Sequence, residues 1–252
     1  MDIRQGKVIV TGGASGLGEA CVRHLAEQGA DVTIFDLHAA RGRAVAAEHG
    51  AGFIEVDVTS EPGVAAAVAG AVAAMGGMTA VINCAGTATG ARTVGRDGAH
   101  PLDLFQKTID INLAGSFNTA RLAAVGMARN SPNADGERGV IINTASVAAF
   151  DGQKGQAAYA ASKAGVAGMT LPMARDLARL GIRCMAIAPG IFRTPMLDGL
   201  GAEVINGLVA DVTFPKRLGQ PGEFARLAGF ILSCAYLNGT TIRLDGALRM
   251  QA

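Results

Sequence analysis

The sequence predicts an α/β fold: one domain built on a doubly wound parallel sheet of seven strands, with helices on both faces. Two patterns lead to this prediction. Short runs rich in β-branched residues, bounded by Gly or Asp, alternate along the chain with Ala-rich stretches of helical length. The strand candidates are also apolar almost throughout, which is typical of strands that are covered on both faces. Because half of the 252 residues are hydrophobic, the chain has enough material for one large core.

The expected elements follow one another without an internal repeat or a low-complexity linker. An apolar run at 8–11 ends at a glycine cluster, and the stretch at 16–28 after it has the length and composition of a helix. The same alternation continues to the last apolar run, at 241–244. The other strands are expected at 32–36, 52–56, 80–83, 140–144 and 183–188, and the other helices at 41–48, 64–75, 102–129, 157–180 and 223–233.

Two segments, 87–101 and 193–214, are expected to be long loops. The first is rich in Gly and polar residues, and the second begins near a Thr-Pro pair and leaves room for a short helix. Long loops at the carboxyl ends of strands usually shape a substrate site. A surface excursion or a subunit contact is the alternative explanation for such loops.

Charge and cysteine content exclude several classes of function. The 22 basic and 21 acidic residues give a net charge of +1 and are scattered, so neither nucleic acid nor an anionic membrane is an expected partner. The four cysteines, Cys21, Cys84, Cys184 and Cys234, have no metal-ligand spacing, so we expect free thiols and no metal site. No export signal or spanning helix is recognisable, which leads us to expect a cytoplasmic protein.

A glycine-rich turn at residues 11–18 follows the first expected strand and opens the first expected helix. Glycines allow the backbone to approach a pyrophosphate, which the helix N-terminus then stabilises. The turn lacks the Lys of a P-loop, which argues against an NTPase. Asp36, at the end of the second strand, can accept hydrogen bonds from the adenosine ribose and would repel a 2′-phosphate, so it favours NAD over NADP. Arg41 and Arg43 are the counter-argument, unless they are solvated residues of the next helix.

Further polar residues follow the third and fourth strands. Asp57 and the segment 83–86 lie where a dinucleotide would cross the strand tips. Asp57 has two explanations, a cofactor contact or a cap of a turn or helix, because Asp is favoured in such caps.

A serine, a tyrosine and a lysine form a candidate catalytic set. Tyr159 and Lys163 are four residues apart in a strong helix pattern, so their side chains share one helix face. Ser146 lies just past the fifth strand, where its hydroxyl can meet a phenol on the next helix. A nearby ammonium lowers the pKa of a phenol, which makes Tyr159 a candidate general acid and base. Asn112 can anchor a water that relays protons to Lys163, or it is an ordinary buried amide.

Together these motifs resemble the short-chain dehydrogenase/reductase family, and they span nearly the whole chain. They are the glycine-rich turn, Asn83-Cys84-Ala85-Gly86, Asn112, Ser146, Tyr159-Ala160-Ala161-Ser162-Lys163 and Pro189-Gly190. The resemblance implies a one-domain Rossmann fold, with a dinucleotide-binding half at about 1–145 and a catalytic and substrate half at about 146–252. It further implies a catalytic tetrad of Asn112, Ser146, Tyr159 and Lys163.

The resemblance also assigns residues to the cofactor and the substrate. Contacts with NAD are expected from Gly12, Ser15, Gly16, Leu17, Gly18, Asp36, Asp57, Val58, Asn83, Cys84, Ala85, Gly86, Tyr159, Lys163, Pro189, Gly190, Phe192 and Thr194. The substrate is expected to face Ser146, Gln153, Gln156 and Tyr159.

Within the family, the central and C-terminal segments are similar to the branch that acts on 3-hydroxyacyl-CoA. These segments are 139–153, 155–159, 168–172, 217–219 and 242–250. The similarity implies NAD-dependent interconversion of (S)-3-hydroxyacyl-CoA and 3-ketoacyl-CoA in a homotetramer. The loops at 87–101 and 196–211 differ most from that branch, and they would set the chain length and any steroid activity.

Two other functions are compatible with the same residues. A hydroxysteroid or other secondary-alcohol dehydrogenase would use the same site on a different substrate. A dinucleotide-sensing protein without turnover would be a different class, but the intact Ser146, Tyr159 and Lys163 argue against it.

Overall fold

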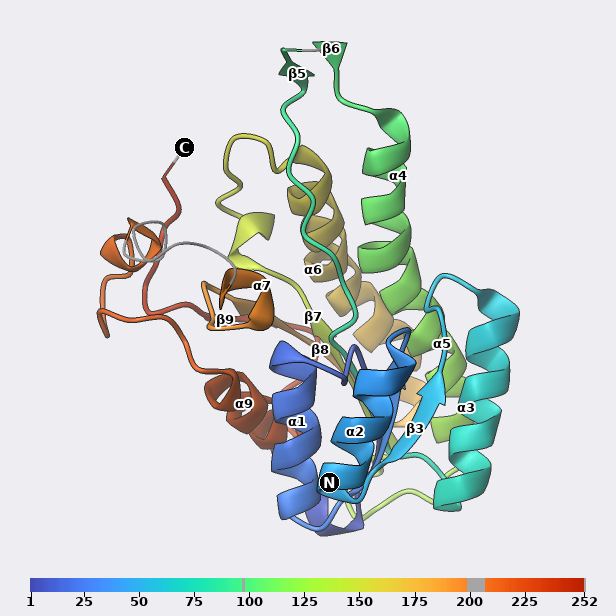
Figure 1. The fold of residues 1–252 in the computed structure, drawn as a ribbon. Helices are drawn as coiled ribbons and strands as arrows, with labels where there is room; N and C mark the ends of the chain where they lie inside the picture. The colour runs from blue at the N-terminus through green and yellow to red at the C-terminus, as the bar shows by residue number, and fades with distance from the viewer. Residues whose placement is uncertain (97, 199–206, 252) are drawn as a thin grey trace.

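The core of the molecule is one parallel sheet. A computed structural model describes residues 1–96, 98–198 and 207–251 (Figure 1). Its seven-stranded sheet has the order β3-β2-β1-β4-β7-β8-β9, and each neighbouring pair is parallel. The strands are β1 (Lys7–Thr11), β2 (Asp31–Asp36), β3 (Gly52–Glu55), β4 (Ala80–Asn83), β7 (Gly139–Thr144), β8 (Ile182–Pro189) and β9 (Thr241–Leu244). The predicted sheet is confirmed, and no predicted strand end is wrong by more than one residue.

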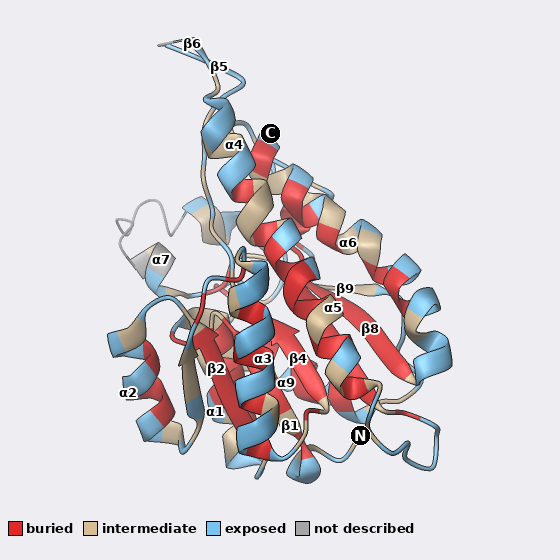
Figure 2. Cartoon of the chain, turned by 90° about the vertical axis from the view of Figure 1, so that its right-hand side faces the viewer, coloured by how far each residue is buried: buried red, intermediate tan, exposed pale blue. Residues whose placement is uncertain are grey.

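Helices cover both faces of the sheet. One face packs against α1, α2 and α9, and the other packs against α3, α5 and α6. Figure 2 shows the buried strands between these layers, with α3 and α5 in front of them. The helices are α1 (Gly16–Glu27), α2 (Ala39–His49), α3 (Glu61–Met75), α4 (Leu102–Ile109), α5 (Gly115–Met127), α6 (Ala157–Leu177), α7 (Pro195–Asp198) and α9 (Pro221–Ser233). The short helical turns are η1 (Ile3–Gln5), η2 (Asp110–Ala114), η3 (Val147–Ala149) and η4 (Ala178–Leu180).

Local capping explains where the predicted helix bounds differ from the observed ones. The apolar pattern places the start of the third helix at residue 64, but α3 begins at Glu61. Ser60 caps it, because its hydroxyl accepts a hydrogen bond from the backbone N–H of Gly63 at 3.2 Å. The helix ends at Met75, and the capping residue Gly76 has a left-handed φ of 66°. The first turn is polar, so hydrophobic periodicity alone misses it.

Two predicted segments contain more structure than the sequence indicates. The helix expected at 102–129 is continuous, but η2 in its middle is a π-helical segment that separates α4 from α5. The loop expected at 87–101 contains a small hairpin, β5 (Val94–Gly95) and β6 (Gly98–Ala99), which projects beyond α4 (Figure 1). The loop expected at 193–214 contains the short helix α7, while its residues 199–206 lie outside the described residues.

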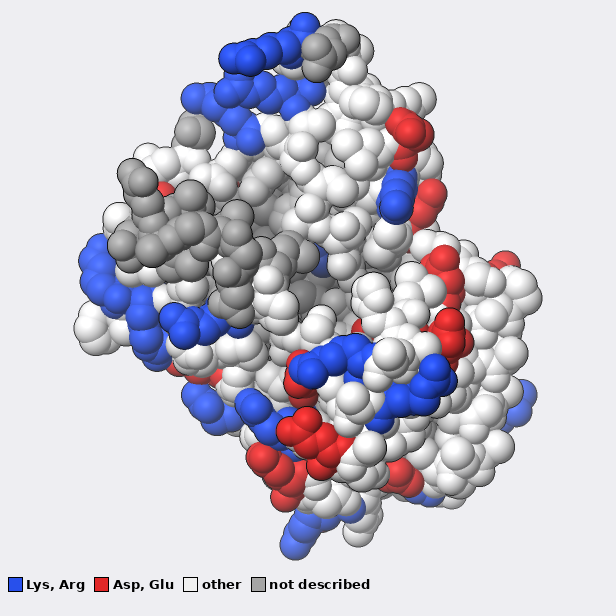
Figure 3. Space-filling model, in the orientation of Figure 1, with Lys and Arg blue, Asp and Glu red and all other residues white. Residues whose placement is uncertain are grey.

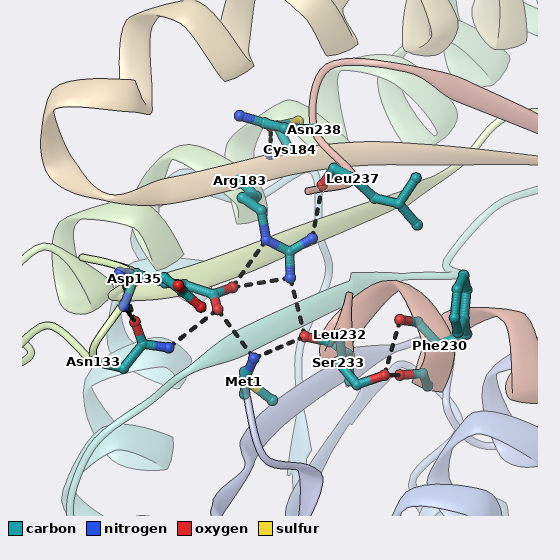
Figure 4. A network of polar contacts seen from close by, with 12 residues as sticks. Met1, Asn133, Asp135, Arg183, Cys184, Phe230, Leu232, Ser233, Leu237 and Asn238 are labelled. Atoms are coloured by element: carbon teal, nitrogen blue, oxygen red, sulfur yellow. Dashed lines mark hydrogen bonds and ion pairs between the residues drawn. The ribbon is translucent and has the colours of Figure 1, made fainter. Parts of the chain in front are cut away.

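A buried polar network lies at the amino ends of β7 and β8, away from the strand tips (Figure 4). Arg183, on β8, donates to Glu137 Oε1 from Nε at 3.0 Å and from Nη2 at 2.9 Å. It also donates to the carbonyl oxygens of Leu232, at the end of α9, and Leu237. The N-terminal ammonium of Met1 donates to Glu137 Oε2 at 3.0 Å. The network therefore fixes the end of α9 to the amino end of β8.

We predict that Arg183→Met lowers the free energy of unfolding by about 3 kcal/mol or more. The side chains of Arg183 and Glu137 are only 7% and 6% exposed, so removal of the guanidinium leaves a carboxylate buried with too few partners. Urea denaturation measures this change. The matched control is Arg129→Met, at an exposed position, with an expected effect within about 0.5 kcal/mol. Equal effects of the two substitutions would contradict the prediction.

Candidate active site

A cleft of about 1190 Å³ runs along the carboxyl ends of the strands. Parallel strands place all their carboxyl ends at one edge of the sheet, and ligands of such sheets bind there. The cleft is lined by the glycine-rich turn after β1, the tips of β2, β3, β4, β7 and β8, and the start of α6. Figure 3 shows a hollow in the middle of this face of the molecule. Parts of the two long loops that the sequence predicts therefore line one cavity together with the strand tips.

The glycine-rich turn forms a cradle in which two positions have no room for a side chain. Gly12 has a φ of 65°, and a Cβ added there would lie 2.7 Å from the backbone nitrogen of Ala85, at the tip of β4. A Cβ on Gly18 would overlap the carbonyl oxygen of Gly12. Only glycine fits at these two positions, so the turn can pack tightly against the tip of β4. Residues of the turn line the cleft at the N-terminus of α1. This arrangement fits the pyrophosphate of a dinucleotide.

Asp36 lies at the tip of β2, where the sequence predicts contact with the adenosine ribose. Its Oδ2 accepts a hydrogen bond from the backbone N–H of Ala14 at 3.1 Å, and its Oδ1 accepts one from His38 at 2.9 Å. Each carboxylate oxygen keeps a lone pair for a further donor. Arg41, the predicted counter-argument, donates from Nη2 to Glu19 at 2.7 Å.

Tyr159 and Lys163 lie on one face of α6 beside the end of β7. The Lys163 Nζ donates to the carbonyl oxygen of Thr144 at 2.8 Å, and it lies 5.8 Å from the centroid of the Tyr159 ring. Ser146 follows β7 and caps η3, because its Oγ accepts a hydrogen bond from the backbone N–H of Ala148 at 3.1 Å. The residues of the Ser146, Tyr159 and Lys163 set, predicted from sequence spacing, all line the same cleft.

Burial controls the protonation of this set. Desolvation raises the pKa of Tyr159 above its ordinary value, and the Ser146 hydroxyl lowers it in part. Desolvation lowers the pKa of Lys163 to about 8. The predicted lowering of the tyrosine pKa by Lys163 is therefore not the dominant effect, because the ammonium is directed to Thr144 and both groups are buried. At neutral pH the site contains a protonated phenol beside an ammonium.

Asn112 lies in the π-helical segment η2 and is fully buried. Its Nδ2 donates to the Thr87 carbonyl at 2.9 Å and to Ser162 Oγ at 3.0 Å, and its Oδ1 accepts from the Thr87 backbone N–H at 2.8 Å. Ser162 in turn donates to the Tyr159 carbonyl at 2.7 Å. Asn112 thus fixes the start of the long loop against α6. It does not line the cleft itself.

Most of the predicted cofactor and substrate residues line the cleft. They are Gly12, Ser15, Gly16, Leu17, Gly18, Asp36, Asp57, Val58, Cys84, Ala85, Gly86, Ser146, Gln153, Gln156, Tyr159, Lys163, Pro189, Gly190, Phe192 and Thr194. Asp57 lines the cleft and also caps a turn, because its Oδ1 accepts hydrogen bonds from the backbone and hydroxyl of Thr59. Both explanations of Asp57 are thus compatible with its position.

Asn83, which the sequence also predicts as a cofactor contact, is the exception, because it is not among the residues that line the cleft. Its side chain is buried beneath the cleft and donates to Asn143 Oδ1 at 2.8 Å and to the Ser116 carbonyl at 3.2 Å. These bonds join the tips of β4 and β7 and the start of α5. The position at a strand tip suggested the cofactor, but the side chain faces into the protein.

The cleft also contains residues that the sequence did not predict as site residues. They are chiefly Ala88, Thr89 and Gly90 in the loop after β4, Asp103, Gln106, Lys107, Asp110 and Ile111 on α4 and η2, and the apolar Leu197, Leu208 and Met250. Met250 ends the segment 242–250 that is similar to the branch, but the sequence does not predict it as a site residue, and only long-range packing brings it to the cleft. Among the described residues there is no cluster of His, Cys, Asp and Glu that could hold a metal ion. Within the same part of the chain, no helix is long and apolar enough to cross a membrane.

Comparisons with known proteins agree with this geometry. A family model described as short chain dehydrogenase matches residues 6–204. The chain is 53% identical over 252 residues to a 3-hydroxyacyl-CoA dehydrogenase type-2 of Drosophila melanogaster, with 98% of this chain and 99% of the relative covered. It is 51% identical to the protein of that name from Homo sapiens, with 96% of this chain and 95% of the relative covered.

A solved structure matches along nearly the whole fold. The crystal structure of 3-hydroxyacyl-CoA dehydrogenase type-2 from Mycobacterium avium superposes with a TM-score of 0.93 at 46% sequence identity, and 97% of this chain and 96% of that chain are covered. These matches agree with the sheet order, the glycine cradle and the positions of the tyrosine and the lysine on α6. The chain belongs to the short-chain dehydrogenase family, with the Rossmann-like fold of that family.

Proposed function

We propose that this protein is an NAD-dependent 3-hydroxyacyl-CoA dehydrogenase that interconverts (S)-3-hydroxyacyl-CoA and 3-ketoacyl-CoA. The observation that carries the proposal is the position of the Ser146 and Tyr159 hydroxyls and the buried Lys163 in one cleft with the glycine cradle. The names of the relatives from Drosophila melanogaster and Homo sapiens support the choice of substrate.

The cleft has room and partners for NAD along the strand tips. Backbone groups of the turn at Gly12–Gly18 would hold the pyrophosphate, and Asp36 would accept hydrogen bonds from the ribose. Phe192 and Thr194, after β8, would hold the nicotinamide end. Thr194 also lies next to the glycine-rich turn, because a Cβ on Gly16 would lie 3.4 Å from Thr194 Cγ2. When bound, the nicotinamide supplies or accepts the hydride at the carbon that bears the substrate oxygen.

The chain's own residues handle the proton. In the direction of reduction, Tyr159 Oη donates its proton to the ketone oxygen, while Ser146 Oγ donates a hydrogen bond to the same oxygen. Burial keeps Tyr159 protonated at neutral pH, so the resting phenol is the acid that this direction needs. In the direction of oxidation, the tyrosinate accepts the proton of the alcohol, and the charge of Lys163 favours that form.

Asn112 acts as a positioning residue in this proposal. A Cβ at Gly86 would lie 3.1 Å from Asn112 Oδ1 and 3.6 Å from Lys163 Nζ, so the three residues lie close together. Through Ser162, Asn112 holds the turn of α6 that carries Tyr159. Gln153 and Gln156 line the cleft together with Ser146, and there they would face the substrate.

A cationic rim at one end of the cleft fits the phosphates of coenzyme A. Lys154 and Arg92 are exposed, and the backbone N–H of Ala91 donates to the carbonyl of Gly155 at 2.9 Å, which brings their two loops together. Their neighbours Gly90 and Gln153 line the cleft. Figure 3 shows Lys and Arg side chains gathered above the hollow, on the side of the β5–β6 hairpin. A steroid ketone has no phosphate groups that could pair with these cations.

The resemblance to the branch also leads us to propose a homotetramer. Partly exposed apolar side chains lie on the outer faces of three helices: Phe117 and Val125 on α5, Leu171 on α6 and Phe230 on α9. Burial of such side chains between subunits would stabilise an assembly.

The first test is the loss of NADH absorbance with acetoacetyl-CoA, acetoacetyl-pantetheine and a steroid ketone as alternative substrates. We expect turnover of the CoA ester, and a lower KM for it than for the pantetheine ester because only CoA reaches the cationic rim. Arg92→Ser should raise the KM for the CoA ester and leave that for the pantetheine ester unchanged. Turnover of the steroid alone would assign the site to the alternative substrate class.

The variant Tyr159→Phe tests the proposed role of the phenol as the proton donor. Loss of the phenol proton should lower kcat by about 10²-fold to 10⁴-fold, since that is the usual contribution of a positioned acid. Binding of NADH, followed by its fluorescence, should persist because the glycine cradle and Asp36 are unchanged. Wild-type turnover by this variant would mean that another group donates the proton.

The cofactor preference depends on Asp36. Asp36→Ala should lower kcat/KM for NADH by about tenfold to a hundredfold, the value of charge-assisted hydrogen bonds, and should raise it for NADPH. The control is Asp31→Ala at the exposed start of β2, outside the cleft. A variant that keeps the wild-type ratio of NADH to NADPH activity would refute the role of Asp36.

The lowered pKa of Lys163 predicts a pH dependence of stability. In the folded protein the pKa is about 8, against an ordinary value of 10.5, so between these values the unfolded chain binds more protons. The free energy of unfolding of the wild type, minus that of Lys163→Met, should therefore rise from pH 8 to pH 10.5, by roughly 3 kcal/mol at most. Chemical denaturation of both proteins across this range measures it. A difference that does not change with pH would be the contrary result.

A further inference from the structure

A set of ion pairs joins the loop after the catalytic serine to the C-terminal segment 245–251. Arg243, on β9, donates from Nη2 to Asp151 Oδ2 at 2.6 Å and from Nε to Asp245 Oδ2 at 2.7 Å. Asp151 follows Ser146 and η3 in the chain. We call Asp151, Arg243 and Asp245 the C-terminal latch. It connects two segments that are 92 residues apart.

The latch is shielded enough to hold its geometry. The side chains of Asp151, Arg243 and Asp245 are only 19%, 23% and 8% exposed. The hydrogen bond from Arg243 lowers the pKa of Asp151, so the carboxylate stays ionised at neutral pH. Short, charge-assisted hydrogen bonds of this kind are stronger than those between neutral groups.

The latch fixes the path of the residues after β9. Arg243 Nη2 also donates to the Leu248 carbonyl at 3.0 Å, and Asp245 Oδ1 accepts from the backbone N–H of Ala247 at 3.0 Å. The Leu248 side chain is fully buried. Together these contacts leave the next residues little freedom to move away from the loop that carries Asp151.

These contacts place Met250 in the wall of the cleft. Met250 lines the same cavity as Tyr159 and Gln153, and Gln153 Nε2 donates to the carbonyl of Gln251 at 3.1 Å. Leu197 and Leu208 are also part of this cavity. Met250 is therefore an apolar wall residue close to Gln153, which the sequence predicts to face the substrate.

We propose that Met250 limits the length of the acyl chain that the site accepts, and that Asp151 and Arg243 act as positioning residues for it. The inference rests on the proposed function, because it concerns the acyl part of that substrate. Met is unbranched and flexible, which suits a wall that fits several short chains. Each methylene that the site can bury is worth about fourfold in kcat/KM.

The test compares 3-ketoacyl-CoA substrates of four and eight carbons with NADH. Met250→Ala removes the thioether end of the side chain, and we expect it to raise the ratio of kcat/KM for eight carbons to that for four carbons by about tenfold. The matched control is Met250→Leu, which keeps the volume and should keep this ratio within about twofold. Thermal unfolding of the variants separates this effect from a loss of folding.

A double-variant cycle tests whether the latch acts through Met250. Asp151→Asn keeps the shape of the side chain but weakens its pair with Arg243, so it should change the chain-length ratio in the same direction, through KM rather than kcat. In Met250→Ala with Asp151→Asn, the second change should add nothing to the ratio, because the wall it positions is gone. Independent, additive effects would refute the positioning role.

The outcomes separate this inference from the proposed function. A wild type without activity on either CoA ester would overturn the proposed function and this inference with it. A wild type that is active, with an unchanged chain-length ratio in Met250→Ala, would overturn the inference alone. A raised ratio in Met250→Ala, with Met250→Leu unchanged, would establish Met250 as the wall of the acyl site.

Discussion

The active site depends on one buried hydrogen bond, from the Lys163 ammonium to the carbonyl oxygen of Thr144. A cation that is removed from water needs a partner, and the carbonyl of the last residue of β7 is that partner. The bond fixes the rotation of α6 relative to the strand and thereby the direction of Tyr159. The Thr144 hydroxyl donates to the sulfur of Cys84 at 3.6 Å, so the same residue also ties β7 to β4. Cofactor cradle and catalytic face are held in one arrangement by this contact.

Sequence patterns were sufficient for the sheet and for most of the cleft. Strands buried on both faces leave continuous apolar runs, and the glycine turn, Asp36 and the Tyr159 and Lys163 pair each have a spacing that their local structure requires. These features are local, so the chain displays them directly. The names of the relatives agree with the reading that the resemblance gave.

Features that arise from packing could not be predicted. A π-helical segment differs from an α-helix by one residue in its hydrogen bonding, so the pattern at 102–129 indicates only a single long helix. Asn83 stands at a strand tip like its neighbours, but only the fold shows that its side chain bonds to Asn143. The pKa of Tyr159 depends on burial, which the spacing to Lys163 does not reveal. Met250 reaches the cleft because Gln251 and Arg243, on either side of it in the chain, bond to residues more than ninety positions earlier.

The order of the strands has a consequence for synthesis on the ribosome. The first strand, β1, lies inside the sheet between β2 and β4, and the apolar face of α1 packs against α9, one of the last elements of the chain (Figure 1). An emerging chain can pair β1 with β2 early, but α1 keeps part of its apolar face in water until residues 221–233 have left the exit tunnel. The final packing of the nucleotide-binding turn therefore waits until α9 has been translated, about 200 residues after α1, and until then that exposed face is a natural target for a chaperone.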